Sequence, residues 1–107
     1  MAVETQDSIA AWANETFGAV GSNARVAARA NEEMAELLRA LTADDYSKKA
    51  DSEAADVVIV LFRLAWRMGF DLLEEVDRKM AVNRTRVWAL DNTGHGYHVR
   101  DKEPPNA

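Results

Sequence analysis

Two pairs of acidic residues, each with its members three positions apart, are the part of this chain best suited to chemistry. Glu33 and Glu36 form the first pair, and Glu53 and Asp56 form the second. Side chains three positions apart lie on one face of an α-helix, so each pair presents two carboxylates together if its segment is helical. Four hard oxygen ligands that converge suit Mg²⁺ or Mn²⁺. The spacing therefore predicts a divalent-metal site.

The second pair stands on a segment that is otherwise strongly apolar. Residues 54–68 are apolar nearly all round a helix, and such a helix must be surrounded by others. Carboxylates inside a bundle are expensive to bury without a counter-ion. A metal ion is one candidate, and salt bridges from Lys49, Arg63 or Arg29 are the alternative. For the first pair and the adjacent Glu32, a solvated helix face is the commoner explanation.

The elements that must position these carboxylates are predicted to be four helices and no strand. Glycines separate the apolar-periodic segments, as they do at helix ends, and both prolines lie at the C-terminal end of the sequence. Ser22 is expected to cap the second helix and Gly69 to end the third. The expected helices cover residues 8–17, 22–41, 47–68 and 71–90, with a loop at 42–46. Residues 92–107 are expected to be irregular.

The fourth predicted helix carries polar residues where an inward stripe would be apolar. Leu72 and Val76 begin the stripe, which continues through Lys79, Asn83 and Arg86 at helical spacing. Two cations and an amide on that face could meet a phosphate chain that a metal ion bridges to the acids. The alternative is a set of ordinary ion pairs with acids of the third helix.

The composition of the chain limits the classes of function. The 107 residues suffice for a single compact domain, and a net charge of −5 argues against binding a nucleic-acid polymer. There is no cysteine for a disulfide, a thiolate metal site or a thiol nucleophile. We find no membrane span or signal peptide and expect a cytoplasmic protein. The apolar third helix predicts a homo-oligomer, because three short companions would not cover it.

These motifs, in this order, resemble those of the MazG-like all-α nucleotide pyrophosphohydrolases. The matching segments are Glu32–Leu37, Glu53–Val57 and Lys79–Arg86, the last of which resembles a Lys-x-x-x-Asn-Arg motif. The resemblance spans about residues 30–88. It implies an all-α fold, a four-helix bundle that assembles as a dimer or a dimer of dimers. It also implies cleavage of a nucleoside triphosphate to the monophosphate and pyrophosphate with Mg²⁺, for which Mn²⁺ could substitute.

The resemblance also implies roles for individual residues. The metal ligands would be Glu33, Glu36, Glu53 and Asp56. The phosphate contacts would come from Lys79, Asn83, Arg84 and Arg86. The carboxylates that act in catalysis would be Glu32, Glu33 and Glu36, with Glu32 a ligand, a neighbour of the ligands or the base that orients water.

The base preference does not follow from these motifs. Trp12 on the first helix is the candidate for a base pocket, whereas Trp66 on the apolar helix is more often a core residue. His95 and His98 could form a metal site, or belong to a flap or a tail. The sequence thus predicts a (d)NTP pyrophosphohydrolase that controls or cleans the nucleotide pool. The alternatives are a phosphoribosyl-ATP pyrophosphatase-like enzyme and a non-catalytic helical dimerisation module.

Overall fold

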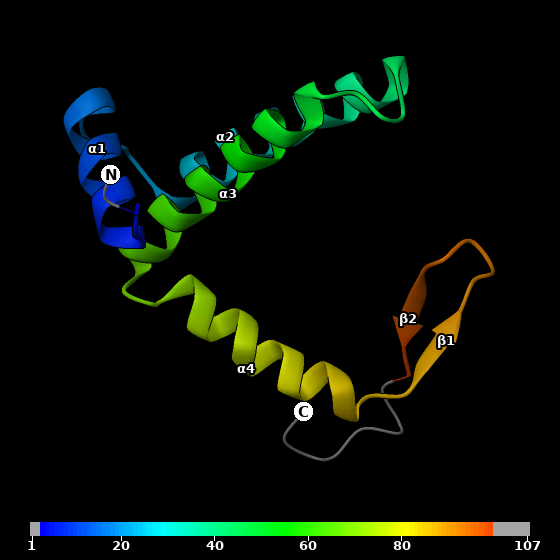
Figure 1. Cartoon of the computed structure of the whole chain (residues 1–107). Coiled ribbons are helices and arrows are strands. Elements are labelled where there is room, and N and C mark those ends of the chain that lie inside the picture. Colours follow the sequence, from blue (N-terminus) through cyan, green and yellow to red (C-terminus); the bar gives the residue numbers. More distant parts are fainter. Residues whose placement is uncertain (1–2, 100–107) are drawn as a thin grey trace. The chain divides into compact units, whose positions relative to one another are not determined.

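A computed structural model of the chain describes residues 3–99. The chain divides into two compact units, with the division between Leu72 and Leu73, and each unit is described by itself. The first unit contains three helices, α1 (Gln6–Phe17), α2 (Asn23–Ala43) and α3 (Lys49–Met68). The second contains most of α4 (Leu72–Thr85) and two short strands, β1 (Trp88–Leu90) and β2 (Gly96–His98) (Figure 1). The described residues are therefore mostly helical, with four helices as the sequence predicts.

In the first unit, α2 and α3 lie side by side as a helical hairpin, and α1 packs against α3 (Figure 1). The buried apolar residues are mostly small: Ala10, Ala13, Val26, Ala30 and Ala65. Small side chains let the helix backbones approach closely, but they bury little apolar surface. This unit therefore has a thin core.

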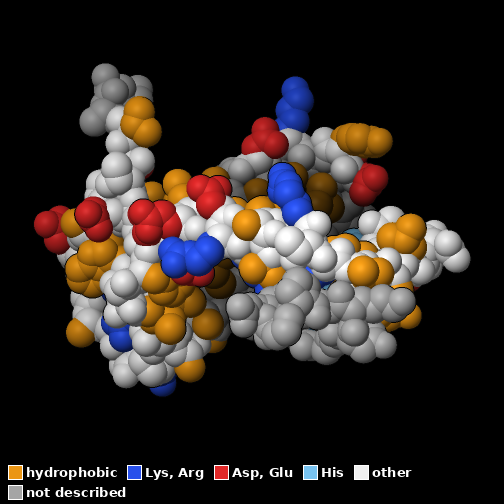
Figure 2. Space-filling view, turned by 90° about the horizontal axis from the view of Figure 1, so that it is seen from below, with side chains coloured by type: hydrophobic (Ala, Val, Ile, Leu, Met, Phe, Trp, Pro, Cys, Tyr) orange, Lys and Arg blue, Asp and Glu red, His pale blue; other side chains and the backbone are white. Residues whose placement is uncertain are grey.

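Many large apolar side chains remain exposed as a result, and Figure 2 shows hydrophobic side chains at many places on the surface. Met34 on α2 is 52% exposed, although Val26 and Ala30, at helical spacing before it, are buried. Val58 and Trp66 on α3 are 44% and 45% exposed. This exposure agrees with the expectation that further protein surface covers α3, and the homo-oligomer itself stays a prediction.

The helix ends follow from local chemistry. The Ser22 side chain accepts a hydrogen bond from Arg25 N at 3.2 Å and caps α2 as predicted. Gly69 ends α3 in the left-handed conformation, at φ 80°, also as predicted. Thr5 and Ser8 form a capping box that starts α1 two residues before the expected position. At the other boundary, α2 continues through Ala43 into the expected loop.

The Gln6 side chain ties the start of α1 to the turn that follows α3. Its amide Nε2 donates to Phe70 O at 2.7 Å, and its Oε1 accepts from Leu72 N at 3.0 Å. The amide thus satisfies two backbone groups that no helix pairs. Nothing in the local pattern of the sequence announces this contact, because its partners are more than sixty positions away.

Replacing Gln6 with alanine is expected to lower the free energy of unfolding by about 1–3 kcal/mol, because two partly buried backbone groups lose their partner. Urea denaturation followed by circular dichroism measures this loss. Glu15→Ala, at an exposed position of the same helix, is the control and should change stability little. Equal stability of the Gln6→Ala variant and the wild type would show that water replaces the amide without cost.

The predicted end of the fourth helix and the absence of strands are wrong. The helix ends at Thr85 instead of near Leu90, and residues 88–90 pair antiparallel with residues 96–98. Arg86 N donates to Asn83 O at 3.2 Å, and the Trp88 indole N–H donates to the same carbonyl at 3.1 Å. These bonds satisfy a carbonyl at the helix end. The fold is therefore not purely α-helical.

The loop between the strands is ordered around Asp91. Its Oδ1 accepts from Thr93 N at 2.9 Å and from Thr93 Oγ1 at 2.6 Å, and these bonds lower the pKa of the Asp91 carboxyl. Asn92 and Gly94 adopt positive φ, at 68° and 92°. The expectation of an irregular segment from residue 92 is thus wrong for residues 96–98. Residues 100–107 lie outside the described part of the chain.

The predicted inward stripe of the fourth helix is only partly sheltered. Val76 is 49% exposed and Lys79 is also exposed, whereas Asn83 and Arg86 are half-buried. No residue of α4 is fully buried. Within residues 3–99, none of the helices combines the length and apolar character that crossing a lipid bilayer requires.

Candidate metal and nucleotide site

Three of the predicted carboxylates converge between α2 and α3. One oxygen each of Glu33, Glu53 and Asp56 lies within 4.8 Å of the other two. The helical spacing of Glu53 and Asp56 places both on one face of α3, and that face packs against α2, which supplies Glu33. Carboxylate oxygens gathered in this way form a ligand set for a hard divalent cation. Glu36 is not a member of this group of three.

Glu33 is the most buried of these acids, at 6% exposure. Burial raises the pKa of its carboxyl above the ordinary value, and the negative charges of Glu36 and Asp56 raise it further. Arg29 acts in the opposite direction without cancelling the rise. Glu36 thus borders the group of three.

The Glu53 carboxylate also suits a metal ligand. Its Oε2 is buried and has no hydrogen-bond partner among the described residues. Buried oxygens of charged groups are nearly always satisfied, and an unpaired buried carboxylate is costly. A divalent metal ion is the kind of partner that would satisfy it together with Glu33 and Asp56.

The salt-bridge alternative for the second acidic pair is not what the structure shows. Within residues 3–99, no lysine or arginine forms an ion pair with Glu53 or Asp56. Arg29 pairs instead with the acids of its own helix: its Nη1 lies 2.7 Å from Glu32 Oε2, and its Nη2 lies 2.7 Å from Glu33 Oε1. These pairs have the spacings i,i+3 and i,i+4 that helices favour.

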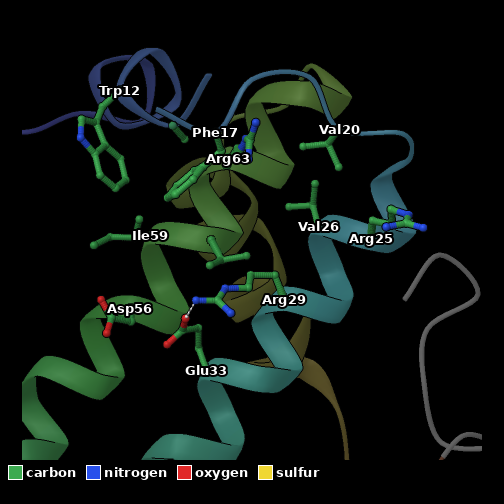
Figure 3. Close-up of a pocket in the computed structure, with 12 residues that line it drawn as sticks. Trp12, Phe17, Val20, Arg25, Val26, Arg29, Glu33, Asp56, Ile59 and Arg63 are labelled. Atoms are coloured by element: carbon green, nitrogen blue, oxygen red, sulfur yellow. Dashed lines mark ion pairs between the residues drawn. The ribbon is translucent and has the colours of Figure 1, made fainter. Parts of the chain in front are cut away.

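A cavity of about 480 Å³ opens beside the acids, within the first unit. Glu33, Asp56 and Arg29 line one end, and Trp12 and Phe17 of α1 line the other (Figure 3). The wall between them is aliphatic and consists of Val20, Val26, Ile59 and Val60. The volume is typical of a small-molecule site. With a divalent cation held by the acids, such a cavity would suit a ligand that is anionic at one end and flat and apolar at the other.

The aromatic end places the predicted base-pocket residue in this cavity. Trp12 is 52% exposed, and its ring meets that of Phe17 edge to face, with centroids 5.4 Å apart and an interplanar angle of 82°. Edge-to-face contact is a favourable arrangement of two aromatic rings. Because Trp12 is half exposed, part of its ring is open to a stacking partner. Phe17 lines the same end of the cavity.

Arg63 supports the same end of the cavity. It is only 9% exposed, its Nη2 donates to Gly18 O at 2.8 Å and to Asn14 Oδ1 at 3.3 Å, and its guanidinium lies 5.9 Å from the Phe17 ring centroid. Arg63 therefore joins α3 to the end of α1 instead of neutralising an acid. The sequence offers Arg63 as a salt-bridge partner for the second acidic pair, and the structure gives it these other partners.

The remaining predicted site residues fall elsewhere. Glu32 is exposed and held by Arg29. The predicted phosphate-binding residues, Lys79, Asn83, Arg84 and Arg86, belong to the second unit, so their approach to the acids stays a prediction. His98 lies in the β-hairpin, where its ring is 6.1 Å from that of Trp88. His95 is in the loop of that hairpin, and neither histidine belongs to the carboxylate group.

The raised pKa of Glu33 predicts how the metal-free protein responds to pH. The folded state holds this proton more tightly than the unfolded state, so the contribution of Glu33 to stability is fully present below the ordinary pKa of 4.5. It is lost as the pH rises through the higher pKa of the folded state. Glu33→Gln should therefore become increasingly more stable than the wild type as the pH rises from about 4.5.

Urea unfolding in EDTA at a series of pH values measures this difference. Glu4→Gln is a suitable control, because Glu4 is exposed and is not one of the three converging carboxylates. A difference between Glu33→Gln and the wild type that stays constant with pH would contradict the raised pKa.

Comparison with known proteins gives consistent matches. The model of the MazG-like family matches residues 31–98. A dATP/dGTP diphosphohydrolase of Cyanophage S-2L is 32% identical over 103 residues, which cover 96% of this chain and 92% of that protein. A dATP/dGTP diphosphohydrolase of Salmonella phage PMBT28 is 34% identical over 100 residues, or 92% of this chain, but the match spans only 31% of that longer protein.

A solved structure is similar over nearly the whole chain. It is the Cyanophage S-2L MazG-like pyrophosphohydrolase bound to dGDP and three catalytic Mn²⁺ ions per active site. The match has a TM-score of 0.73 and 31% sequence identity, and it covers 94% of this chain and 93% of that one.

Proposed function

Since this chain belongs to the MazG-like family, we propose that it hydrolyses deoxynucleoside triphosphates, dATP and dGTP first, to the monophosphate and pyrophosphate. The broader prediction from the sequence, a hydrolase acting on phosphoric anhydrides, is confirmed by its relatives, which are named diphosphohydrolases and pyrophosphohydrolase. The observation that carries the proposal is the convergence of Glu33, Glu53 and Asp56 at the acidic end of a cavity with an aromatic far end.

In this proposal Glu33, Glu53 and Asp56 hold the divalent metal, with Glu36 beside them. Mg²⁺ is the proposed physiological ion, and Mn²⁺ can replace it, since both prefer oxygen ligands. The Mn²⁺ ions of the similar solved structure support a divalent metal at this site. Bound there, the metal would polarise phosphoryl oxygens and lower the pKa of water. Glu32 or Glu36 would accept the proton of the attacking water.

The positive side of the site is proposed to come from the second unit. Lys79, Asn83, Arg84 and Arg86 would bind the phosphates and offset the charge of the leaving pyrophosphate. We retain the proposal of a homodimer or a dimer of dimers, which the exposed apolar residues of α3 support. In such an assembly, these residues would complete a site with the carboxylates of their own chain or of a partner chain.

The aromatic end of the cavity is proposed to bind the base. Trp12 offers an indole face for stacking, and stacking tolerates either purine because every base has a π-face. The aliphatic wall formed by Val26, Ile59 and Val60 would lie against the apolar surface of the nucleoside. The purine specificity in the names of both curated relatives supports the choice of dATP and dGTP.

A panel of substrates tests the proposal. The purified protein is incubated with each dNTP and NTP, and with phosphoribosyl-ATP, in Mg²⁺ or Mn²⁺, and both products are quantified. Equal amounts of pyrophosphate and monophosphate from dATP or dGTP, abolished by EDTA, are expected. Hydrolysis of phosphoribosyl-ATP alone would identify the histidine-synthesis activity. If the folded oligomer releases no pyrophosphate from any nucleotide, the remaining explanation is the non-catalytic helical dimerisation module.

A further inference from the structure

Arg29 lies beside the converging carboxylates but has no role in the proposed reaction. It lies one turn before Glu33 on α2, and its guanidinium is shared between Glu32 and Glu33, with both N–O distances at 2.7 Å. The Arg29 side chain is 59% exposed, whereas that of Glu33 is 9% exposed. Arg29 also lines the cavity beside the acids (Figure 3). It is thus a cation that a buried carboxylate of the cluster holds at the cavity surface.

The Glu33 carboxylate cannot pair equally well with the Arg29 guanidinium and with a divalent cation at the same time. Glu33 Oε1 already lies 2.7 Å from Arg29 Nη2, and the arginine keeps its charge under all ordinary conditions. A divalent ion bound by Glu33, Glu53 and Asp56 would lie close to that charge and repel it. Binding of the metal must therefore compete with the ion pair between Arg29 and Glu33.

A guanidinium released from Glu33 has room and a natural ligand. Its side chain is more than half exposed, so it can turn within the cavity without moving a packed core. A phosphate chain bound at the acidic end would lie next to it. Arginine binds phosphate oxygens in a bidentate manner, through two parallel hydrogen bonds.

We propose that Arg29 is the internal counter-ion of the metal site. In the metal-free protein it neutralises Glu33; the divalent metal displaces it, and the displaced guanidinium then binds the phosphates of the nucleotide. The second step depends on the proposed function, whereas the first depends only on metal binding. Arg29 can keep its ion pair with Glu32 in both states, because Glu32 is not one of the three converging carboxylates.

The two steps make opposite predictions for the removal of the guanidinium. Without Arg29 the metal has no cation to displace and meets a more negative site, so it should bind more tightly. The nucleotide, however, loses a charged hydrogen-bonding partner and should bind less tightly. A residue that merely held Glu33 in place would change both affinities in the same direction, because its loss would disorder a metal ligand.

The experiment titrates Mn²⁺ alone into the full chain and detects the free ion by electron paramagnetic resonance. Arg29→Ala and Arg29→Gln are expected to bind Mn²⁺ at least about threefold more tightly than the wild type, because they lack the competing charge. Arg29→Lys keeps the charge and should stay near the wild type. Arg78→Ala is the matched control, because Arg78 forms an exposed i,i+3 ion pair with Glu75 on α4 and should not change the affinity.

The second measurement is the KM for dGTP at saturating Mn²⁺. It is expected to rise about tenfold in Arg29→Ala, the scale of a lost charged hydrogen bond, with a smaller rise in Arg29→Lys. Weaker or unchanged Mn²⁺ binding in Arg29→Ala and Arg29→Gln would overturn the displacement. Tighter Mn²⁺ binding with an unchanged KM would overturn the phosphate contact.

The same measurements distinguish failure of the proposed function from failure of the proposed role of Arg29. A wild-type protein that binds Mn²⁺ and hydrolyses no nucleotide would contradict the enzymatic proposal alone, since the Mn²⁺ titration still tests the displacement. A wild-type protein that binds no Mn²⁺ would overturn both. Circular dichroism of each variant establishes that its helices are intact before either affinity is compared.

Discussion

Replacing Asp56 with asparagine is expected to lower kcat/KM for dGTP by about 100- to 1,000-fold, the scale seen when a preorganised charge is removed from an active site. Asparagine keeps the size of the side chain and one oxygen, but it lacks the negative charge that would hold a divalent ion. The helices should remain intact, because Asp56 forms no ion pair within residues 3–99 that its loss would break. Steady-state kinetics and circular dichroism measure the two effects.

The metal-free Asp56→Asn variant should be at least as stable as the wild type. The charge of Asp56 acts against the charge of Glu33, as the raised pKa of Glu33 shows, so its removal relieves repulsion. Asp51→Asn is the control, because Asp51 lies on the same helix but is not one of the three converging carboxylates. An Asp56→Asn variant that unfolds would show a structural role for Asp56, and one that keeps full activity would show that the activity needs no metal ligand at this position.

Replacing Trp12 with alanine is expected to raise the KM for dATP and dGTP by about tenfold, because stacking of a base on an aromatic ring contributes roughly 1–3 kcal/mol. The effect on kcat should be smaller, since the reacting phosphates lie at the other end of the cavity in the proposed complex. Trp12→Phe should recover much of the loss by restoring a stacking face.

Tyr46 provides the control for Trp12. It is an aromatic residue with 90% exposure, it lies between α2 and α3, and it does not line the cavity. Tyr46→Ala should leave the KM unchanged. If Trp12→Ala binds both purine nucleotides as the wild type does, the aromatic end of the cavity is not the base pocket.

The sequence predicted the arrangement of these side chains best where helix geometry alone decides it. The three-residue spacing of Glu53 and Asp56 fixed their common face once α3 formed. Ser22 and Gly69 marked helix ends through their own backbone chemistry. Membership of the MazG-like family and the class of enzyme were also predicted correctly from the ordered motifs.

Contacts between distant segments could not be predicted in this way. The cavity depends on how α1 packs against α3, and no local pattern specifies that Phe17 and Arg63 meet there. The hairpin was missed because residues 88–90 continue the apolar pattern of a helix and are too few to show alternation. Arg29 is different, because its spacings of three and four to Glu32 and Glu33 were visible in the sequence.

A titration of Mn²⁺ into the wild type, Glu53→Gln and Asp51→Asn, without nucleotide, is the most direct test of the carboxylate site. Glu53 is the informative position, because its buried Oε2 has no hydrogen-bond partner among the described residues and glutamine keeps its shape. We expect Mn²⁺ to bind the wild type and Asp51→Asn with the same affinity, and Glu53→Gln at least about tenfold more weakly. Equal affinity of all three proteins for Mn²⁺ would contradict a metal site formed by Glu33, Glu53 and Asp56.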